Sequence, residues 1–104
     1  MLDKRKFYIN GKWVSPSKPN DLEVINPSNE DPYAVISLGS KEDIDKAVKA
    51  AKTAFESWKK TSKEERLKLL EKLLEVYKKR FNEMAKAISD EMGAPMDCAT
   101  EVQT

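Results

Sequence analysis

Histidine is absent from this sequence of 104 residues, and cysteine occurs only once, at Cys98. Without histidine the chain has no His-based triad, no imidazole general base and none of the commonest metal ligand. A single cysteine excludes an internal disulfide and a cysteine-rich zinc site. No apolar run approaches the roughly 18 residues of a membrane-spanning helix, and residues 1–7 lack the apolar core of a signal peptide. We therefore expect a soluble, cytoplasmic chain.

The chain also lacks an excess of either charge, because its 19 Lys and Arg residues nearly balance its 18 Asp and Glu residues. Proteins that bind nucleic acid usually carry a basic excess, so nucleic acid is a poor candidate partner. The basic runs Lys59-Lys60 and Lys78-Lys79-Arg80 are better interpreted as solvated helix ends, where the helix dipole favours cations. The three glycines, Gly11, Gly39 and Gly93, stand far apart. No Gly-rich phosphate loop is present, and we expect this chain to bind no nucleotide.

Apolar residues are few for a globular domain: 39% of the chain is hydrophobic and 36% is charged. Typical domains have about 45–50% and about 25%, respectively. The length suits one small domain. The composition indicates that much of each helix is solvated, or that the chain packs against a surface outside it.

The N-terminal part has the pattern of strands and turns. Residues 7–9 and 12–14 flank Asn10-Gly11, a strong signal for a two-residue hairpin in which both turn residues have positive φ. A short strand is predicted at Val24-Ile25, ended by Asn26-Pro27, and another over residues 34–38, closed by Gly39.

The rest of the sequence has helical periodicity. Ser40 is a good N-cap, and Asp43 three residues later makes a weak capping box. Lys59-Lys60 ends this first helix. The apolar residues on its face are Ile44, Ala47, Val48, Ala51, Phe55 and Trp58.

A second helix is predicted to begin after Ser62, which forms a capping box with Glu65. Asn82 is a possible cap for a separate third helix, and the pattern leaves open whether the chain breaks there or continues. Gly93 suits a helix C-terminus, and Pro95 suits the first turn of a further helix, which reaches Thr104 in less than three turns and makes the chain look truncated. The apolar stripe of the second helix contains Leu70, Leu73, Leu74, Tyr77 and Phe81, with Leu67 beside it, and it continues with Met84, Ala85, Ile88 and Met92.

Few side chains are candidates for chemistry. Cys98 has no histidine to activate it, and its neighbours Asp97 and Glu101 are acidic, which raises a thiol pKa. We therefore interpret Cys98 as a small residue packed on a helix. The pair Asp90-Glu91 lies near a helix C-terminus, where acids are disfavoured, so a functional or buried-partner role stays open. The other pairs, Glu42-Asp43 and Glu64-Glu65, suit helix first turns, and the aromatic residues Trp13, Trp58, Tyr77 and Phe81 are spaced for core packing.

Several segments together resemble the N-terminal part of aldehyde dehydrogenases, in the family's order and spacing. Ala94 departs from the family pattern, which usually has Lys there. The matching segments are Phe7 to Val14, Val24 to Pro27 with Ala34 to Ile36, Asp43 to Val48 with Ala50-Ala51, Ala54-Phe55 and Trp58, Glu65-Arg66 with Leu69-Leu70, and Glu91 to Pro95.

This resemblance implies an enzyme that oxidises aldehydes to carboxylic acids through a cysteine thiohemiacetal and hydride transfer to NAD or NADP. It also implies that the catalytic Cys, its Glu base, the oxyanion Asn and the Gly-rich cofactor turn lie beyond Thr104. Cys98 does not match the catalytic motif. Some members hold a structural monovalent cation, and the matching positions are Ile25 and Glu91. No catalytic, cofactor-binding or metal-binding residue is therefore predicted within the 104 residues.

The predicted fold class is an α+β fragment: a β-hairpin and a short strand pair, followed by three to four amphipathic helices. Residues 1–39 carry the strands and residues 40–104 the helices, as parts of one incomplete domain forming the outer layer of a nucleotide-binding domain. By itself the chain is expected to be inactive, to bind no cofactor and to self-associate through exposed apolar helix faces. The alternative is a free-standing helical protein-interaction module.

Overall fold

The computed structural model describes residues 1–103 of the chain. These residues divide into two compact units. The first contains Met1–Val24 and Pro32–Lys60, and the second contains Ile25–Asp31 together with the residues from Thr61 on.

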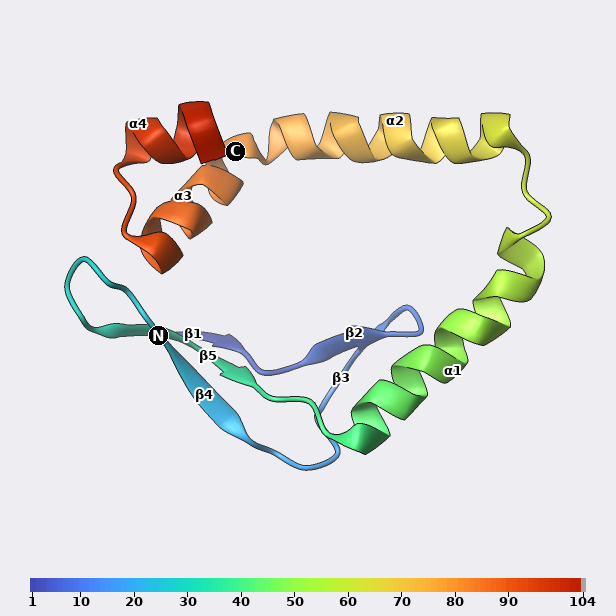
Figure 1. Cartoon of the computed structure of the whole chain (residues 1–104), viewed down its shortest axis with the longest axis horizontal. Helices are drawn as coiled ribbons and strands as arrows, with labels where there is room; N and C mark the ends of the chain where they lie inside the picture. The colour runs from blue at the N-terminus through green and yellow to red at the C-terminus, as the bar shows by residue number, and fades with distance from the viewer. Residues whose placement is uncertain (104) are drawn as a thin grey trace. The chain divides into compact units, whose positions relative to one another are not determined.

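A three-stranded sheet has the order β1-β5-β4, with β1 at Leu2–Lys4, β5 at Pro32–Ser37 and β4 at Asp21–Ile25 (Figure 1). Strand β1 runs parallel to β5, with Leu2 opposite Ala34. The two predicted strands are confirmed. Strand β4 begins earlier than the predicted Val24, and β5 lies one to two residues before the predicted range 34–38. Strand β1 was not predicted from the sequence, because its three residues, two of them charged, have no strand pattern.

The predicted hairpin is confirmed. Strand β2, Phe7–Ile9, pairs antiparallel with β3, Lys12–Val14, so that only Asn10 and Gly11 form the turn. Their φ angles are 54° and 75°, as a type I′ turn requires. Tyr8 and Trp13 lie opposite each other with ring centroids 5.2 Å apart. Trp13 is nevertheless 68% exposed, so the expectation that it packs in a core is wrong, because this two-stranded hairpin has an open face.

Helix α1, Lys41–Trp58, begins at Ser40 with a full capping box, stronger than the sequence indicated. The Ser40 hydroxyl accepts from the Asp43 N–H, and the Asp43 carboxylate accepts from the Ser40 N–H. Strand β2 contacts this helix. Asp43 is the buried residue of α1, whereas Ile44, Val48 and Phe55 of the apolar stripe are exposed. The stripe has the predicted helical spacing, but in the described part of the chain it is not a core face.

A break at Arg80 separates helix α2, Lys63–Lys79, from helix α3, Phe81–Met92. The backbone of Arg80, with φ −106° and ψ 15°, leaves the helical range, which settles the question that the sequence left open. Asn82 lies inside α3 rather than at its cap. At the start of α2 the Ser62 hydroxyl accepts from the Glu65 N–H at 3.2 Å, which is one half of the predicted capping box.

Gly93 ends α3 in the left-handed conformation, with φ 73°, and its N–H donates to the Ser89 carbonyl at 2.8 Å. Pro95 then precedes the short helix α4, Met96–Cys98, which continues as the π-helix η1, Ala99–Gln103. The predicted helix end and the next helix start are thus confirmed to within a residue. Ala85 of α3 and Ala99 of η1 are buried, and these two elements contact each other.

Small residues form the buried part of the described chain. The buried apolar residues are Ala34, Ala85 and Ala99, and no large side chain among the described residues is fully buried. Five short strands and the helices that follow them give the mixed α and β architecture that the sequence predicted. None of the helices within residues 1–103 combines the length and the hydropathy that crossing a membrane requires.

Candidate functional site

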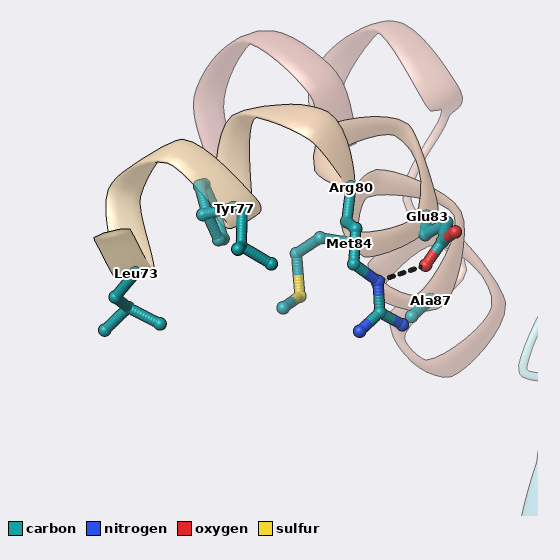
Figure 2. Close-up of a pocket in the computed structure, with 7 residues that line it drawn as sticks. Leu73, Tyr77, Arg80, Glu83, Met84 and Ala87 are labelled. Carbon is teal, nitrogen blue, oxygen red and sulfur yellow. Dashed lines mark hydrogen bonds and ion pairs between the residues drawn. The ribbon is translucent and has the colours of Figure 1, made fainter. Parts of the chain in front are cut away.

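An open groove of about 330 Å³ lies where α2 meets α3. The break at Arg80 turns the chain so that the end of α2 and the start of α3 line one hollow (Figure 2). Tyr77 and Phe81 pack edge to face across the break, with ring centroids 6.2 Å apart and an angle of 87° between the rings. The lining residues are Leu73, Val76, Tyr77, Arg80, Glu83, Met84 and Ala87.

The polar part of this groove is a single ion pair. The Arg80 Nε atom donates to the Glu83 Oε2 atom at 2.7 Å (Figure 2). Both side chains are well exposed, so the pair contributes little to stability. The remaining lining is mostly apolar and holds no nucleophile with an adjacent base. This arrangement suits the binding of an apolar surface rather than a chemical reaction.

Asp43 is the centre of a second polar cluster, at the start of α1. Its Oδ2 atom accepts from the backbone N–H and the hydroxyl of Ser40, both at 3.0 Å, and its Oδ1 atom accepts from the Ser17 N–H at 3.1 Å. The Ser40 backbone hydrogen bond, followed by those from Ser17 and the Ser40 hydroxyl, holds the pKa of Asp43 below its ordinary value of 3.8, and partial desolvation opposes them. A buried carboxylate that accepts several hydrogen bonds is a poor proton acceptor. Asp43 therefore has a structural role: it holds the loop at Ser17 against the start of α1.

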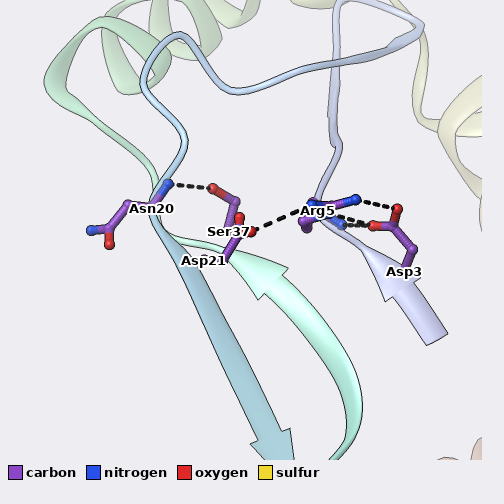
Figure 3. A network of polar contacts seen from close by, with 5 residues as sticks. All are labelled: Asp3, Arg5, Asn20, Asp21 and Ser37. Carbon is purple, nitrogen blue, oxygen red and sulfur yellow. Dashed lines mark hydrogen bonds and ion pairs between the residues drawn. The ribbon is translucent and has the colours of Figure 1, made fainter. Parts of the chain in front are cut away.

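A third polar network lies along the three-stranded sheet (Figure 3). The Arg5 guanidinium donates to Asp3 at 2.8 and 2.9 Å and to Asp21 at 3.4 Å. Hydrogen bonds from Arg5 lower the pKa of Asp3 from 3.8 to about 2, and the same contacts raise the pKa of Arg5. Nearby, the Asn20 N–H donates to the buried Ser37 hydroxyl at 3.3 Å. This network joins segments that are distant in sequence. Both of its carboxylates, Asp3 and Asp21, accept hydrogen bonds from Arg5, so they are not arranged as a catalytic acid and base.

The residues singled out in the sequence are not brought together. Cys98 lies in α4, half-buried, with its N–H donating to the Asp97 carboxylate at 2.9 Å. Asp90 forms an ion pair with Lys86, one turn earlier, at 2.9 Å, which offsets its unfavourable place near the end of α3. Glu91 and Ile25 are both exposed. Within residues 1–103 no three acidic or cysteine side chains form a group that could hold a metal ion.

Sequence reasoning left one feature of these clusters open and missed another. It allowed a helix break near Asn82, and the break that builds the groove lies at Arg80, where neither Pro nor Gly marks it. The Ser17 contact with Asp43 joins residues 26 positions apart. The pairing of Ser40 with Asp43 was visible, whereas the distant donor has no local signal.

Comparison with known proteins decides the family. The model of the aldehyde dehydrogenase family matches residues 13–104. The chain belongs to this family. Because the match includes strands as well as all the helices, it favours an aldehyde dehydrogenase segment over the free-standing helical module.

Individual aldehyde dehydrogenases match over nearly the whole chain. A 3-succinoylsemialdehyde-pyridine dehydrogenase of a Pseudomonas species is 49% identical over 96 residues, which are 92% of this chain and 20% of that protein. The crystal structure of an aldehyde dehydrogenase from Bartonella henselae has a TM-score of 0.98 and 62% identity, covering 99% of this chain and 22% of that one.

A mutant of aldehyde dehydrogenase C from Pseudomonas syringae, solved with NAD+ and octanal, has a TM-score of 0.93 and 41% identity. Here the alignment covers 95% of this chain and 20% of the other. The chain therefore spans about a fifth of the length of the relatives that it matches.

Proposed function

We propose that these residues belong to an NAD(P)-dependent aldehyde dehydrogenase that oxidises an aldehyde to a carboxylic acid. The observation that carries the proposal is the family match over residues 13–104. The similarity to a relative solved with both NAD+ and an aldehyde supports the same cofactor and substrate class. A cytoplasmic location is part of the proposal.

We propose further that the segment supplies structure rather than catalysis. In this view residues 1–104 contain no catalytic, cofactor-binding or metal-binding residue, and they form one part of a larger domain, as its outer layer over the nucleotide-binding core. The half-buried Cys98 has a neighbouring acid and no histidine to activate it, which supports this role. The chain by itself would then oxidise no aldehyde.

The exposed apolar helix faces are proposed as the contact surfaces of the segment. In a full-length enzyme they would pack against the rest of the polypeptide. In the 104-residue chain they would be covered by a second copy. Leu70 and Leu73, at 62% and 63% exposure, support this proposal, because burying such a side chain fully contributes roughly 1.5–3 kcal/mol.

A chimera tests the proposed function. Residues 1–104 replace the aligned segment of the Bartonella henselae enzyme, and NADH production from a simple aldehyde is measured. We expect a folded chimera that reduces NAD+ when aldehyde is added, because the replaced segments have the same fold at 62% identity. A folded chimera without activity, beside an active parental enzyme, would contradict the assignment.

Two further measurements test the structural role. In the chimera, Cys98→Ala should leave the rate of NADH production unchanged, because in this proposal the thiol takes no part in the reaction. The isolated 104-residue chain should produce no NADH from the same aldehyde. Activity of the isolated chain that disappears with Cys98→Ala would show that the segment carries chemistry after all.

A further inference from the structure

The turn of the β2–β3 hairpin places two groups that can react with each other side by side in the chain. Asn10 carries a side-chain amide, and Gly11, which follows it, has no side chain. Both residues are exposed to solvent. Among the described residues, neither the Asn10 side chain nor the Gly11 N–H has a hydrogen-bond partner. The electrophilic carbon, Asn10 Cγ, and the neighbouring backbone nitrogen are therefore both available.

Little holds the turn against a change of conformation. A β carbon built at Gly11 would meet no atom within 4 Å. Strands β2 and β3 have three residues each and form a two-stranded sheet of their own, and such a hairpin is only marginally stable in water. Local opening of the turn thus needs little free energy. It lets the Gly11 nitrogen approach Asn10 Cγ without steric hindrance.

The surroundings of Asn10 are cationic. The hairpin lies beside α1, with β2 in contact with it (Figure 1). Asn10 lines a groove of about 410 Å³ there together with Lys12, Lys46 and Lys49. The lining, all of it within the described residues, contains no carboxylate. Negative charge that develops on Asn10 is therefore stabilised by attraction to the ammonium groups.

We propose that Asn10-Gly11 is a site of spontaneous modification, at which Asn10 deamidates through a cyclic imide formed with Gly11. The Gly11 nitrogen attacks Asn10 Cγ and closes a succinimide ring. The bond from Cγ to Nδ2 breaks, and ammonia leaves with the proton from the Gly11 N–H. Water then adds to either imide carbonyl and breaks its bond to the nitrogen. Attack at Cγ gives aspartate, and attack at the main-chain carbonyl gives isoaspartate.

The two products have different effects on the hairpin. Aspartate keeps the turn, because Asp-Gly favours the same type I′ conformation as Asn-Gly. Isoaspartate adds one carbon to the main chain of a two-residue turn, so the register that places Tyr8 opposite Trp13 is no longer maintained. Since β2 contacts α1, the second product also loosens the hairpin from this helix.

Peptide mapping by mass spectrometry tests the site. The folded 104-residue chain is incubated in mildly alkaline buffer without denaturant, and each asparagine is followed in the same digests. Asn29 is the internal control, because it is also exposed, but Glu30 follows it and its Oδ1 atom accepts from the Asp31 N–H at 3.0 Å. We expect Asn10 to convert at least about tenfold faster than Asn29, a factor that corresponds to about 1.4 kcal/mol in the barrier.

Enzymatic methylation of isoaspartate identifies the second product. The incubated wild-type chain should become a substrate of an isoaspartyl methyltransferase. Asn10→Gly preserves a turn that accepts positive φ and should remove most of this labelling. Proton NMR of the labelled wild-type fraction should show weaker contacts between the Tyr8 and Trp13 rings than in the fresh chain.

Two lysine variants test the contribution of the groove. Lys49→Gln removes one of its cations and should slow the conversion of Asn10 about twofold or more at low ionic strength, a difference that added salt should diminish. Lys68→Gln, in α2 and outside the groove, should leave the rate unchanged. Circular dichroism checks that both variants are folded.

The outcomes separate the parts of this inference. An Asn10 that keeps its amide in the folded chain, or that converts only in urea, would overturn the proposal, because the closed turn would then protect it. Equal rates at Asn10 and Asn29 would show that the turn has no special reactivity and would also overturn it. A rate that Lys49→Gln leaves unchanged would overturn the electrostatic contribution. None of these results bears on aldehyde oxidation, which the chimera measures.

Discussion

Gly93 and Pro27 pack so closely that a β carbon on Gly93 would meet the Pro27 Cγ atom at 3.0 Å. The Ser28 hydroxyl would stand at 3.3 Å from the same position. This contact fixes the turn between β4 and β5 against the end of α3, within the second unit. Because Gly93 also has a φ of 73°, two independent constraints favour glycine there.

Gly93→Ala should therefore lower the free energy of unfolding by at least about 1–2 kcal/mol, the usual cost of a left-handed L-residue, with the contact to Pro27 adding to it. Urea denaturation followed by circular dichroism measures the change. Gly39→Ala is the matched control, because its φ is not in the left-handed range and its nearest atom, Phe7 Cζ, stands at 3.9 Å. Equal losses in the two variants would contradict this explanation.

Gly11→Val should weaken the hairpin through backbone strain alone. No atom lies within 4 Å of a β carbon at Gly11, but its φ is 75°. A β-branched residue in this region costs on the order of 1–2 kcal/mol. Proton NMR should show weaker contacts between the Tyr8 and Trp13 rings, which the turn holds opposite each other. Unchanged ring contacts would mean that the turn tolerates the strain.

Asp43→Asn should reduce the loss of unfolding free energy that occurs when the pH is lowered. Folding lowers the pKa of Asp43 below 3.8, so its contribution is present in full above that value and is lost as the pH falls through the lower folded-state pKa. Urea denaturation at about pH 6 and about pH 3 measures the loss. We expect a smaller loss in Asp43→Asn than in wild type. The exposed Asp45→Asn serves as the control and should keep the wild-type difference.

Arg5→Gln should raise the pKa of Asp3 from about 2 towards 3.8, since hydrogen bonds from Arg5 are the main cause of the lowering. Carboxyl carbon NMR of Asp3 during an acid titration measures the shift. Both side chains are about half-exposed, so the thermal stability should change little. A pKa that stays near 2 in the variant would assign the lowering to another donor.

Local features were predictable because a few adjacent residues determine them. Asn10-Gly11 specified the hairpin, since only certain residues accept positive φ at both turn positions. Ser40 and Ser62 specified two helix starts through their own hydroxyls. Gly93 similarly marked the end of α3.

Features formed by distant residues were not predictable. Strand β1 forms because Leu2 pairs with Ala34, 32 positions later, whereas its own three residues have no strand pattern. Helical periodicity identified the apolar faces but not what covers them, because the same stripe suits a core and a contact surface. Trp13 shows this limit, with strand spacing as expected and an exposed ring.

The candidate site was predictable in its chemistry rather than its shape. The lack of histidine and of a Gly-rich loop was evident from composition. The groove depends on the bend at Arg80, whose neighbours Lys79 and Phe81 are ordinary helix residues. No sequence rule for helix breaks applies at that position.

The parallel pairing of β1 with β5 has a consequence for the order of folding. The β2–β3 hairpin closes over two residues and can form within microseconds once Val14 has left the ribosome. Strand β1 must wait until Ile36 has been synthesised, because its partner comes later in the chain. The N-terminal strand is thus made first but joins the sheet late, and during synthesis its backbone donors and acceptors stay open to whatever protein or chaperone binds nascent chains.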